Sequence, residues 1–335
     1  MIRTAASTSI DPILLAALVC PRDREDLDLA VDALSCPRGH RYPVVGNIPV
    51  MLLDDVAQTL AVATDSIREA AHAAPPEVRS DESVPAAVDP YVQKAIGATG
   101  GYLYNELQQS LREYPIPKMR LARASAAGEY LLDVGSNWGR WCVAASALGY
   151  AAVGIDPSLE AIQAAARVAR QLGADARFVV GDARYLPFAG STFRAVFSYS
   201  VLQHFAKSDA SRAFGEVGRV LKPGGHSLIQ MANAYGLRCF YHQLRRNFRE
   251  PVNFEVRYWT PGELKSVASR VIGPTALSID GFFSLNPQHS DLRFLRPAHR
   301  LVVRASDAMR ALSEFAPALL NVADSIYLSS EKAAD

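Results

Sequence analysis

The sequence has few cysteines and no long apolar run. Only four cysteines occur in 335 residues, and two lie in segments that we expect to be core or helix. A disulfide framework is therefore not expected, and a reducing, cytoplasmic location fits best. No apolar stretch approaches the ~20 residues of a transmembrane helix, so we expect no membrane span. The apolar segment 12–19 ends at Cys20-Pro21 instead of a small-residue cleavage site, which favours a structural helix over a signal peptide.

An excess of charge of one sign is also lacking. Lys and Arg number 35 and Asp and Glu 34, so the formal net charge is +1. This balance gives no whole-chain argument for a membrane surface, and we expect no nucleic-acid partner. A chain of 335 residues can bury a full-sized core and has room for one large domain and one small one.

The stretch 131–158, LLDVGSNWGRWCVAASALGYAAVGIDPS, is the most informative part of the sequence. An apolar run ends at a glycine turn, a small-residue helix is expected over 141–148, and a second apolar run, 151–155, precedes Asp156. This order predicts the first half of a doubly wound nucleotide-binding sheet. Gly135 and Gly139 let a ligand approach the backbone. The helix that follows presents its positive end to an anionic group.

The spacing within this stretch favours S-adenosylmethionine (SAM) over a dinucleotide. Asp156 lies about 20 residues beyond the first glycine, where a carboxylate can accept hydrogen bonds from both hydroxyls of a ribose. That feature alone does not separate NAD from SAM. Gly135 and Gly139, however, form G-x-x-x-G, and Asn137 and Arg140 stand where a dinucleotide motif requires glycine. A turn without a ligand, with Asp156 as a helix N-cap, is the alternative.

Alternating elements continue through the rest of the chain. The alanine-rich segment 159–172 predicts a helix that stops at Gly173. Thr260 and Pro261 predict the start of another helix, and the region 291–315 is expected to be helical. Further strands are expected within 177–181, 193–205, 217–233, 276–283 and 325–329.

Five motifs in this order resemble those of class I SAM-dependent methyltransferases. They are DVGSNWG, GIDPS, GDARYLPF, FSYSVLQHF and EVGRVLKPGG, and the resemblance runs from about Gly128 to the C-terminus. It implies an α/β fold with a Rossmann-like, doubly wound, seven-stranded sheet. The last strand would lie antiparallel between strands five and six. It also implies SAM as the cofactor.

Matching positions assigns roles to individual residues. In the resembled family the methionine end of SAM lies in the glycine loop, the ribose on the acid of the second strand and the adenine beside the acid after the third. The fourth strand ends beside the reactive methyl group. The cofactor-binding residues implied here are Asp133, Gly135, Ser136, Asn137, Gly139, Asp156, Pro157, Asp182, Ala183 and Ser198. For Asp182, a turn residue without a ligand is the alternative.

Candidates for catalysis and acceptor binding come from three segments. His204 is the candidate general base, because its ordinary pKa near 6.5 suits proton abstraction at neutral pH; a structural role in closing the loop is the alternative. Tyr199, at the end of the fourth strand, is a weaker candidate that would also contact the acceptor. Other acceptor-binding candidates are Tyr102 and Tyr104 on a helical lid, and His242 and Arg245 in an insertion around 234–257.

The first 55 residues resemble the small zinc-binding activator subunit that partners several tRNA and protein methyltransferases, most clearly in YPVVGNIPVML. They would form a small α+β, zinc-ribbon-like module. The family's C-x-x-C pairs are replaced here, so a structural zinc ion would be held by Cys20, Asp23, Cys36 and His40. A metal-free knuckle closed by hydrophobic packing is the alternative. The expected domains are thus 1–55, a linker and lid over 56–127, and a methyltransferase domain over 128–335.

The sequence favours methyl transfer from SAM to a small-molecule or glycan acceptor, at an oxygen. Transfer to protein or tRNA and a non-catalytic SAM-binding scaffold are the alternatives. Against base methylation, the fourth strand ends in SYSV and lacks an Asn-Pro-Pro-Tyr type of motif. Fold alone does not name an acceptor.

Overall fold

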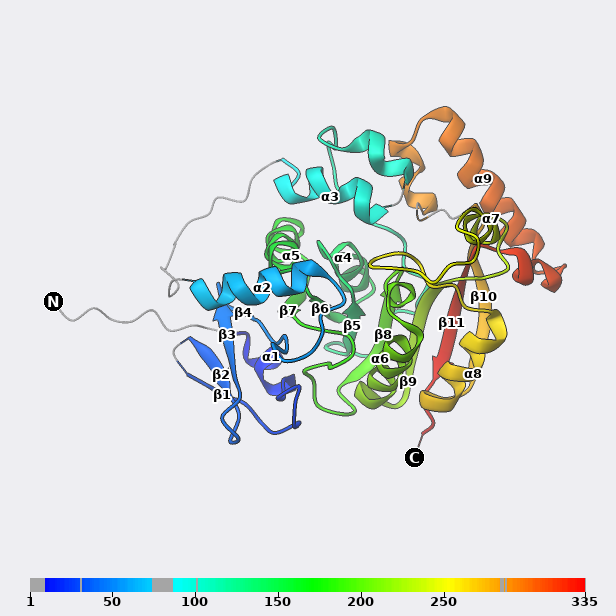
Figure 1. The fold of residues 1–335 in the computed structure, drawn as a ribbon. Helices are drawn as coiled ribbons and strands as arrows, with labels where there is room; N and C mark the ends of the chain where they lie inside the picture. The colour runs from blue at the N-terminus through cyan, green and yellow to red at the C-terminus, as the bar shows by residue number, and fades with distance from the viewer. Residues whose placement is uncertain are drawn as a thin grey trace.

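The computed structural model describes residues 10–30, 32–73, 87–100, 102–283, 286 and 288–334, and it omits the side chains of 98–100 and 102. A seven-stranded sheet forms the centre of the molecule (Figure 1). Its strands are β5 (Tyr130–Val134), β6 (Ala151–Asp156), β7 (Ala176–Val180), β8 (Phe193–Tyr199), β9 (Leu221–Ala232), β10 (Thr275–Gly281) and β11 (Ser325–Glu331).

The strand order is β10-β11-β9-β8-β5-β6-β7. Strands β5 to β9 pair in parallel, whereas β11 is antiparallel to both of its neighbours, β9 and β10. The predicted fold class and the predicted antiparallel last strand are therefore confirmed. The chain runs outward from β5 through β6 to β7 and then returns to place β8 on the other side of β5. This reversal opens a crevice at the carboxyl ends of β5 and β8, where open α/β sheets bind ligands.

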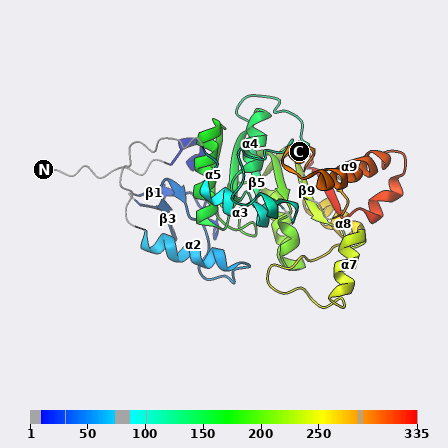
Figure 2. The same ribbon diagram turned by 90° about the horizontal axis from the view of Figure 1, so that it is seen from above.

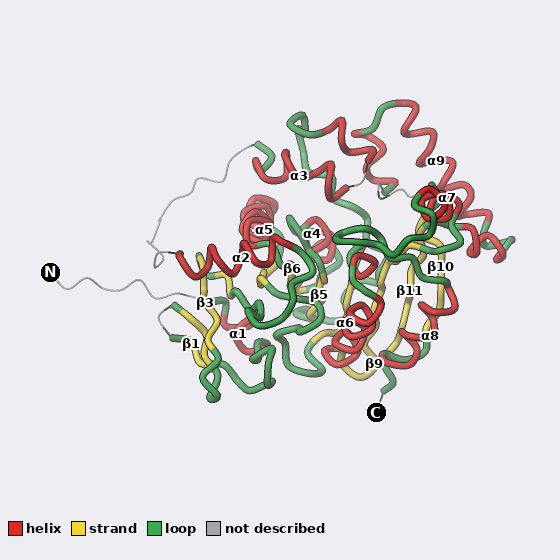
Figure 3. Tube along the Cα trace, viewed as in Figure 1, coloured by secondary structure: helices red, strands yellow, loops and turns green. Residues whose placement is uncertain are grey.

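Helices cover both faces of the large sheet (Figure 3). Helices α4 (Arg140–Ala147) and α5 (Leu159–Leu172) pack on one face, and α6 (Lys207–Val220) and α8 (Pro261–Val271) on the other. Helix α5 has the predicted bounds because the Ser158 side chain caps Ala161 N at 3.2 Å and Gly173 adopts the left-handed conformation. Helix α8 begins at Pro261 with a capping box between Thr260 and Glu263.

A second, smaller sheet belongs to the N-terminal module. It has the order β1-β2-β3-β4 and follows α1 (Pro12–Ala17). The strands are β1 (Asp28–Leu29), β2 (Ala33–Ser35), β3 (Arg41–Val45) and β4 (Ile48–Pro49). The module adjoins the β7 edge of the large sheet (Figure 1), where Val50 forms a parallel bridge with Val180 and Met51 N donates to Val180 O at 2.7 Å. The module thus packs against the edge of the large sheet.

The segment between the module and β5 forms α2 (Ala61–His72), α3 (Pro90–Gly100) and η1 (Tyr102–Leu107). Helix α2 docks on the start of α5, because Ser66 Oγ donates to Pro157 O at 2.8 Å and accepts from Leu159 N at 2.9 Å. Helix α3 is tied to α5 by an ion pair of 2.7 Å between Asp89 and Arg167. The segment predicted as linker and lid therefore packs over the first half of the sheet.

The remaining helices lie near the other end of the sheet. They are α7 (Leu237–Arg245), η3 (His289–Phe294), α9 (Pro297–Leu312) and η4 (Pro317–Val322), and η2 (Leu202–His204) follows β8. Figure 2 shows α7 and the yellow loop beside it standing out from the body of the molecule. None of the helices in the described ranges is both long and apolar enough to cross a membrane.

Candidate active site

A cavity of about 730 Å³ lies at the crevice between the carboxyl ends of the parallel strands. One half is lined by the glycine loop, the end of β6, the start of α2 and α3. The other half is lined by the end of β8, η2, α7 and the loop after α7. Residues that line the cavity include Thr59, Tyr91, Gly135, Asn137, Asp156, Pro157, Asp182, Ala183, Tyr199, His204, Gln230, His242, Phe254 and Tyr258.

The glycine loop has the shape that a closely bound ligand requires. Gly135 has a φ of +79°, and a Cβ at this position would collide with the side chain of Val201. The loop is fixed to β6, because the amides of Gly135 and Ser136 both donate to Ile155 O, at 2.8 and 3.0 Å. Gly139, also left-handed with a φ of +80°, forms the N-cap of α4. Ser136 Oγ is buried without a hydrogen-bond partner among the described residues, so this loop has unused polar capacity.

Asp156 faces the cavity at the end of β6. Its carboxylate accepts from Asn137 N at 3.0 Å and from Ser158 N at 3.0 Å. Burial raises the pKa of Asp156 to about 6, although both amide hydrogen bonds oppose this shift. A partly desolvated carboxylate with lone pairs toward a cavity is suited to accept hydrogen bonds from a ribose diol. Pro157 lines the cavity beside it.

Asp182 and Ala183 line the cavity after β7, as predicted, but the Asp182 carboxylate already has a partner. Arg184 Nη2 lies 2.6 Å from Asp182 Oδ2, and Arg184 N donates to Asp182 Oδ1 at 2.8 Å. Arg184 also donates to Ala57 O at 2.9 Å. The carboxylate is therefore held in one position, and an adenine amino group would share it with the guanidinium.

Four predicted cofactor residues, Asp133, Ser136, Gly139 and Ser198, do not line the cavity. The Asp133 side chain is buried against α4 and accepts a hydrogen bond of 3.4 Å from Cys142 Sγ. Burial raises the pKa of Asp133 to about 7. Ser198 Oγ is buried within the sheet and donates to Val134 O at 3.0 Å. The side chains of Asp133 and Ser198 lie under the cavity, and their assignment to direct cofactor contact stays a prediction.

Tyr199 lines the cavity, but its hydroxyl belongs to a buried polar network. It donates to Asp280 Oδ2 at 2.8 Å and accepts from Gln288 Nε2 at 2.9 Å. Burial raises the pKa of Tyr199 well above its ordinary value, and the nearby Asp280 carboxylate adds to the shift. A phenol that stays protonated and already donates to a carboxylate is poorly suited to act as a base.

His204 has a defined orientation in the half of the cavity that is lined by η2, α7 and the loop after α7. Its ring stacks on Phe254, with centroids 3.8 Å apart and planes 9° apart. His204 Nδ1 lies 2.8 Å from Phe254 O, and because a carbonyl only accepts, Nδ1 carries the proton and Nε2 is the basic nitrogen. Burial lowers the pKa of His204, against the opposing effect of the Phe254 carbonyl. The imidazole is therefore neutral near pH 7.

The predicted acceptor-binding residues separate in the structure. His242 lines the cavity from α7, whereas Arg245 is exposed and lies over the ring of Tyr241 at 5.9 Å. Tyr104 is buried away from the cavity and donates to Asp291, which also pairs with Arg140 at 3.3 Å. The side chain of Tyr102 lies outside the described part of the structure.

Sequence reasoning missed two residues that line the half of the cavity next to the glycine loop. Tyr91 on α3 accepts a hydrogen bond of 3.3 Å from Asn137 Nδ2, and burial raises the pKa of Tyr91 to about 12. Thr59 lines the cavity before α2, and its Oγ1 is buried without a partner in the described ranges. Thr59 lies in the predicted linker and Tyr91 in the predicted lid, and only the tertiary packing shows that these two residues lie beside the glycine loop.

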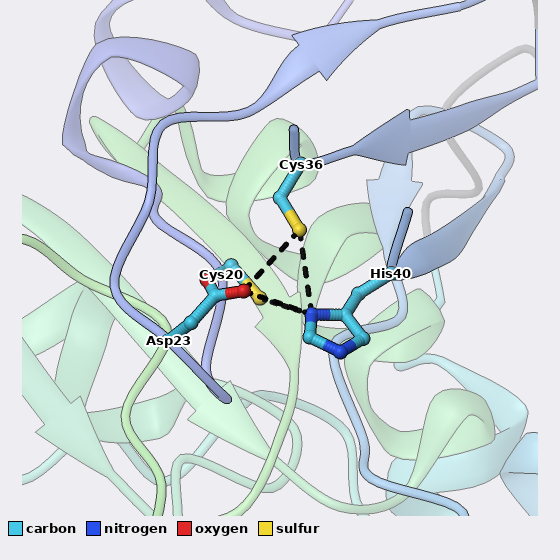
Figure 4. A group of neighbouring side chains, drawn as sticks. All are labelled: Cys20, Asp23, Cys36 and His40. Carbon is cyan, nitrogen blue, oxygen red and sulfur yellow. Dashed lines mark hydrogen bonds and ion pairs between the residues drawn. The ribbon is translucent and has the colours of Figure 1, made fainter. Parts of the chain in front are cut away.

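The four predicted metal ligands converge in the N-terminal module (Figure 4). One ligand atom from each of Cys20, Asp23, Cys36 and His40 lies within 4.8 Å of all the others. His40 Nδ1 lies 3.0 Å from Asp23 Oδ2, 3.3 Å from Cys36 Sγ and 3.5 Å from Cys20 Sγ. Zinc bonds of about 2.0–2.3 Å in a tetrahedron give ligand separations of roughly 3.3–3.8 Å. The two distances from His40 to the thiols lie in this range and the His40–Asp23 distance is shorter, so the donor set fits a zinc ion with a small adjustment of the carboxylate.

The strand order and the cavity at the strand ends define a class I SAM-dependent methyltransferase fold. Residues 131–225 match the family model of the methyltransferase domain. The chain thus contains a class I SAM-dependent methyltransferase domain.

Curated relatives named as methyltransferases match part of this chain. An uncharacterized methyltransferase, YcgJ of Bacillus subtilis, is 33% identical over 100 residues, which are 30% of this chain and 39% of the relative. A ubiquinone biosynthesis O-methyltransferase of Brucella anthropi is 32% identical over 114 residues, which are 33% of this chain and 45% of the relative. The matches therefore span less than half the length of these relatives.

Two solved structures are similar over a larger share of the chain. The structure of YcgJ covers 64% of this chain and 94% of its own, with a TM-score of 0.43 and 19% identity. A chain from the complex between the Haloferax volcanii Trm112 methyltransferase activator and a methyltransferase covers 73% of this chain and 95% of its own, with a TM-score of 0.46 and 17% identity.

Proposed function

We propose that this protein binds SAM in the cavity and transfers the methyl group to an oxygen of a small-molecule or glycan acceptor. The observation that carries the proposal is the continuity of one cavity from Asp156 and the glycine loop to His204. This continuity supports a cofactor site and a site for a deprotonatable acceptor next to each other, which methyl transfer requires.

The residues of the cofactor half fit the polar groups of SAM. Asp156 would accept from the ribose hydroxyls, and Asp182 with the Ala183 amide would meet the adenine. Thr59 lines the cavity, and its Oγ1 has no hydrogen-bond partner in the described ranges, so it is free to meet a polar group of the ligand. Bound SAM would supply an electrophilic methyl group, and the chain would exclude water and hold the acceptor in line, since orientation provides much of the rate.

The acceptor half combines aromatic walls with a few polar groups. Phe254 and Tyr258 give apolar surface, and Gln230 and His242 can fix the orientation of a polar acceptor. His204 Nε2 would remove the proton from an acceptor hydroxyl as the oxygen attacks. The similarity to a relative named as an O-methyltransferase supports oxygen as the acceptor atom.

Two measurements test the proposal. Calorimetry with SAM and with its demethylated product, S-adenosylhomocysteine, should show binding. The absence of binding heat in folded protein would overturn the proposal that this protein is a SAM-dependent methyltransferase. Incubation with methyl-labelled SAM and separate pools of metabolites, cell protein and RNA should label the metabolite pool. Label in protein or RNA would assign a macromolecular acceptor, and binding without labelling in any pool would point to a non-catalytic SAM-binding scaffold.

We further propose that residues 1–55 act as a structural module that holds one zinc ion, that residues 56–127 close the cofactor site and that residues 128–335 carry catalysis. The four clustered side chains and the joint between Met51 and Val180 support this division. A cytoplasmic location is part of the proposal, because none of the four cysteines is bonded to another.

A further inference from the structure

Helix α7 presents an apolar face to solvent. Leu237, Phe240, Tyr241 and Leu244 follow the spacing i, i+3, i+4, i+7, so they share one side of the helix. Each is half exposed, with 50–54% of its surface accessible. A helix that packs only on its own domain turns such a stripe inward.

The opposite side of α7 and the residues after it are polar and turned toward the protein. His242 lines the cavity, Gln243 Nε2 donates to Ala234 O at 2.8 Å, and Arg246 Nη1 donates to Val256 O at 3.1 Å. Cys239 is buried on this side. The apolar side of this helix therefore faces solvent and its polar side faces the protein, which is the reverse of an ordinary surface helix. Phe240 contacts Phe248 of the following loop, with ring centroids 5.9 Å apart.

The apolar surface continues into the loop that follows α7. Phe248 and Val252 are more than half exposed, at 57% and 55%. With Leu237, Phe240, Tyr241 and Leu244 they form what we call the α7 patch. Figure 2 shows the helix and loop projecting together at the edge of the molecule, away from the N-terminal module. Phe254, which stacks on His204, is also exposed and joins the patch to the rim of the cavity.

The segment that carries the α7 patch has a net positive charge. The segment 234–257 contains five arginines and two glutamates, a net charge of +3, in a chain whose formal net charge is +1. Arg245 lies beside Tyr241 on the exposed helix, and the Arg249 charge is balanced by Glu255 at 2.7 Å. An exposed stripe of leucine, phenylalanine and tyrosine with arginine beside it fits a membrane surface, where the acyl chains are apolar and the phospholipid headgroups above them are anionic.

We infer that the α7 patch docks on a bilayer surface that contains anionic phospholipid. Helix α7 lies in the plane of the interface, with its apolar side chains below the headgroups and its arginines among the phosphates. Docking in this way places the acceptor half of the cavity at the membrane surface, because His242 and Phe254 belong to the same segment. The inference depends on the exposed face of α7 and not on methyl transfer, so binding alone tests it.

Vesicle co-sedimentation of the full chain provides the test. Vesicles of 30% phosphatidylglycerol and 70% phosphatidylcholine should sediment the protein at low salt, and vesicles of pure phosphatidylcholine should bind it about tenfold less. The double variant Phe240→Ser, Leu244→Ser should reduce partitioning onto the anionic vesicles about tenfold or more. Arg245→Glu should weaken binding and flatten its salt dependence.

Matched controls distinguish docking through the α7 patch from non-specific hydrophobic binding and from unfolding. Leu301→Ser with Phe315→Ser removes two other exposed apolar side chains, 70% and 84% accessible, outside α7 and should leave binding unchanged. Circular dichroism should show unchanged folding in all variants. Failure of the parent protein to bind anionic vesicles would overturn the inference, as would an equal loss in the control. A dimer that forms in solution and is broken by Phe240→Ser, Leu244→Ser would assign the patch to a second copy instead.

Discussion

The imidazole of His204 lies flat against the ring of Phe254 while its Nδ1 donates to the carbonyl oxygen of the same residue at 2.8 Å. One residue therefore fixes both the plane and the tautomer of the histidine. His204→Ala should lower methyl transfer by about 10²–10⁴-fold, because it removes the group that accepts the acceptor proton. Binding of S-adenosylhomocysteine should be unchanged, and full turnover by the variant would remove His204 as the base.

The pH dependence of turnover should report the same residue. Because burial lowers the pKa of His204 below 6.5, the imidazole is neutral and active at pH 7. The rate constant for the chemical step should be flat above pH 6.5 and fall as the pH drops through the lowered pKa. An acid limb that persists in His204→Ala would assign the titration to another group.

Asp156 should control cofactor affinity. Asp156→Asn keeps the shape but removes the charge that we propose accepts from both ribose hydroxyls, and affinity for S-adenosylhomocysteine should fall about tenfold to a hundredfold in calorimetry. In the parent, affinity should weaken as the pH falls through about 6, where the carboxylate becomes protonated. Asp65→Asn, on the exposed side of α2, is the matched control and should bind as the parent does.

Asp133 should make stability depend on pH. Its pKa is about 7 in the folded protein against an ordinary value of 3.8, so the folded state holds this proton more tightly than the unfolded state. Its contribution is present below pH 4 and is lost as the pH rises to 7, by up to roughly 4 kcal/mol at about 1.4 kcal/mol per pKa unit. Urea unfolding should show Asp133→Asn gaining stability relative to the parent between pH 4 and 7. A constant difference would contradict the buried-carboxyl interpretation.

The purified protein should carry one equivalent of zinc. Cys36→Ser should lower the zinc content measured by elemental mass spectrometry and reduce the melting temperature, since a structural metal stabilises the fold that presents its ligands. Cys239→Ala, a cysteine remote from the cluster in sequence, should retain the metal. Less than a tenth of an equivalent in the parent would show that the knuckle is closed without metal.

Removal of residues 1–55 should reduce stability and solubility. The module shares a hydrophobic core with the large sheet through residues such as Leu14, Leu18 and Leu34, and Met51 pairs with β7. Its loss would expose apolar surface and an unpaired strand edge, which favours aggregation. Size-exclusion chromatography and thermal melting check this; a monomeric, active truncation with an unchanged melting temperature would refute it.

The local parts of the fold and site could be predicted from the sequence. Gly135, Gly139 and Asp156 lie within one β-turn-α-β unit, so their spacing fixes their positions in space. The four cysteine, histidine and aspartate side chains of the N-terminal module likewise lie on two short knuckles. These predictions depend on few residues and short connections.

Side-chain direction and the closure of the cavity could not be predicted in the same way. Strand residues alternate between faces, so a small error in where β8 ends decides whether Ser198 or Tyr199 meets the cavity, and Ser198 points into the sheet. Thr59 and Tyr91 reach the glycine loop only through the packing of α2 and α3 against α5. The partner of Asp182, Arg184, has a charge that suggests solvent exposure, yet it is buried.

The position of β11 has a consequence for the order of assembly. Within the described residues, β10 pairs in the large sheet with β11 alone, which lies between β10 and β9. During synthesis, β10 leaves the ribosome well before β11, so its backbone hydrogen-bonding groups stay unpaired until β11 has been made. Strands β5 to β9 can associate earlier, so completion of the domain is governed by the arrival of the segment Ser325–Glu331.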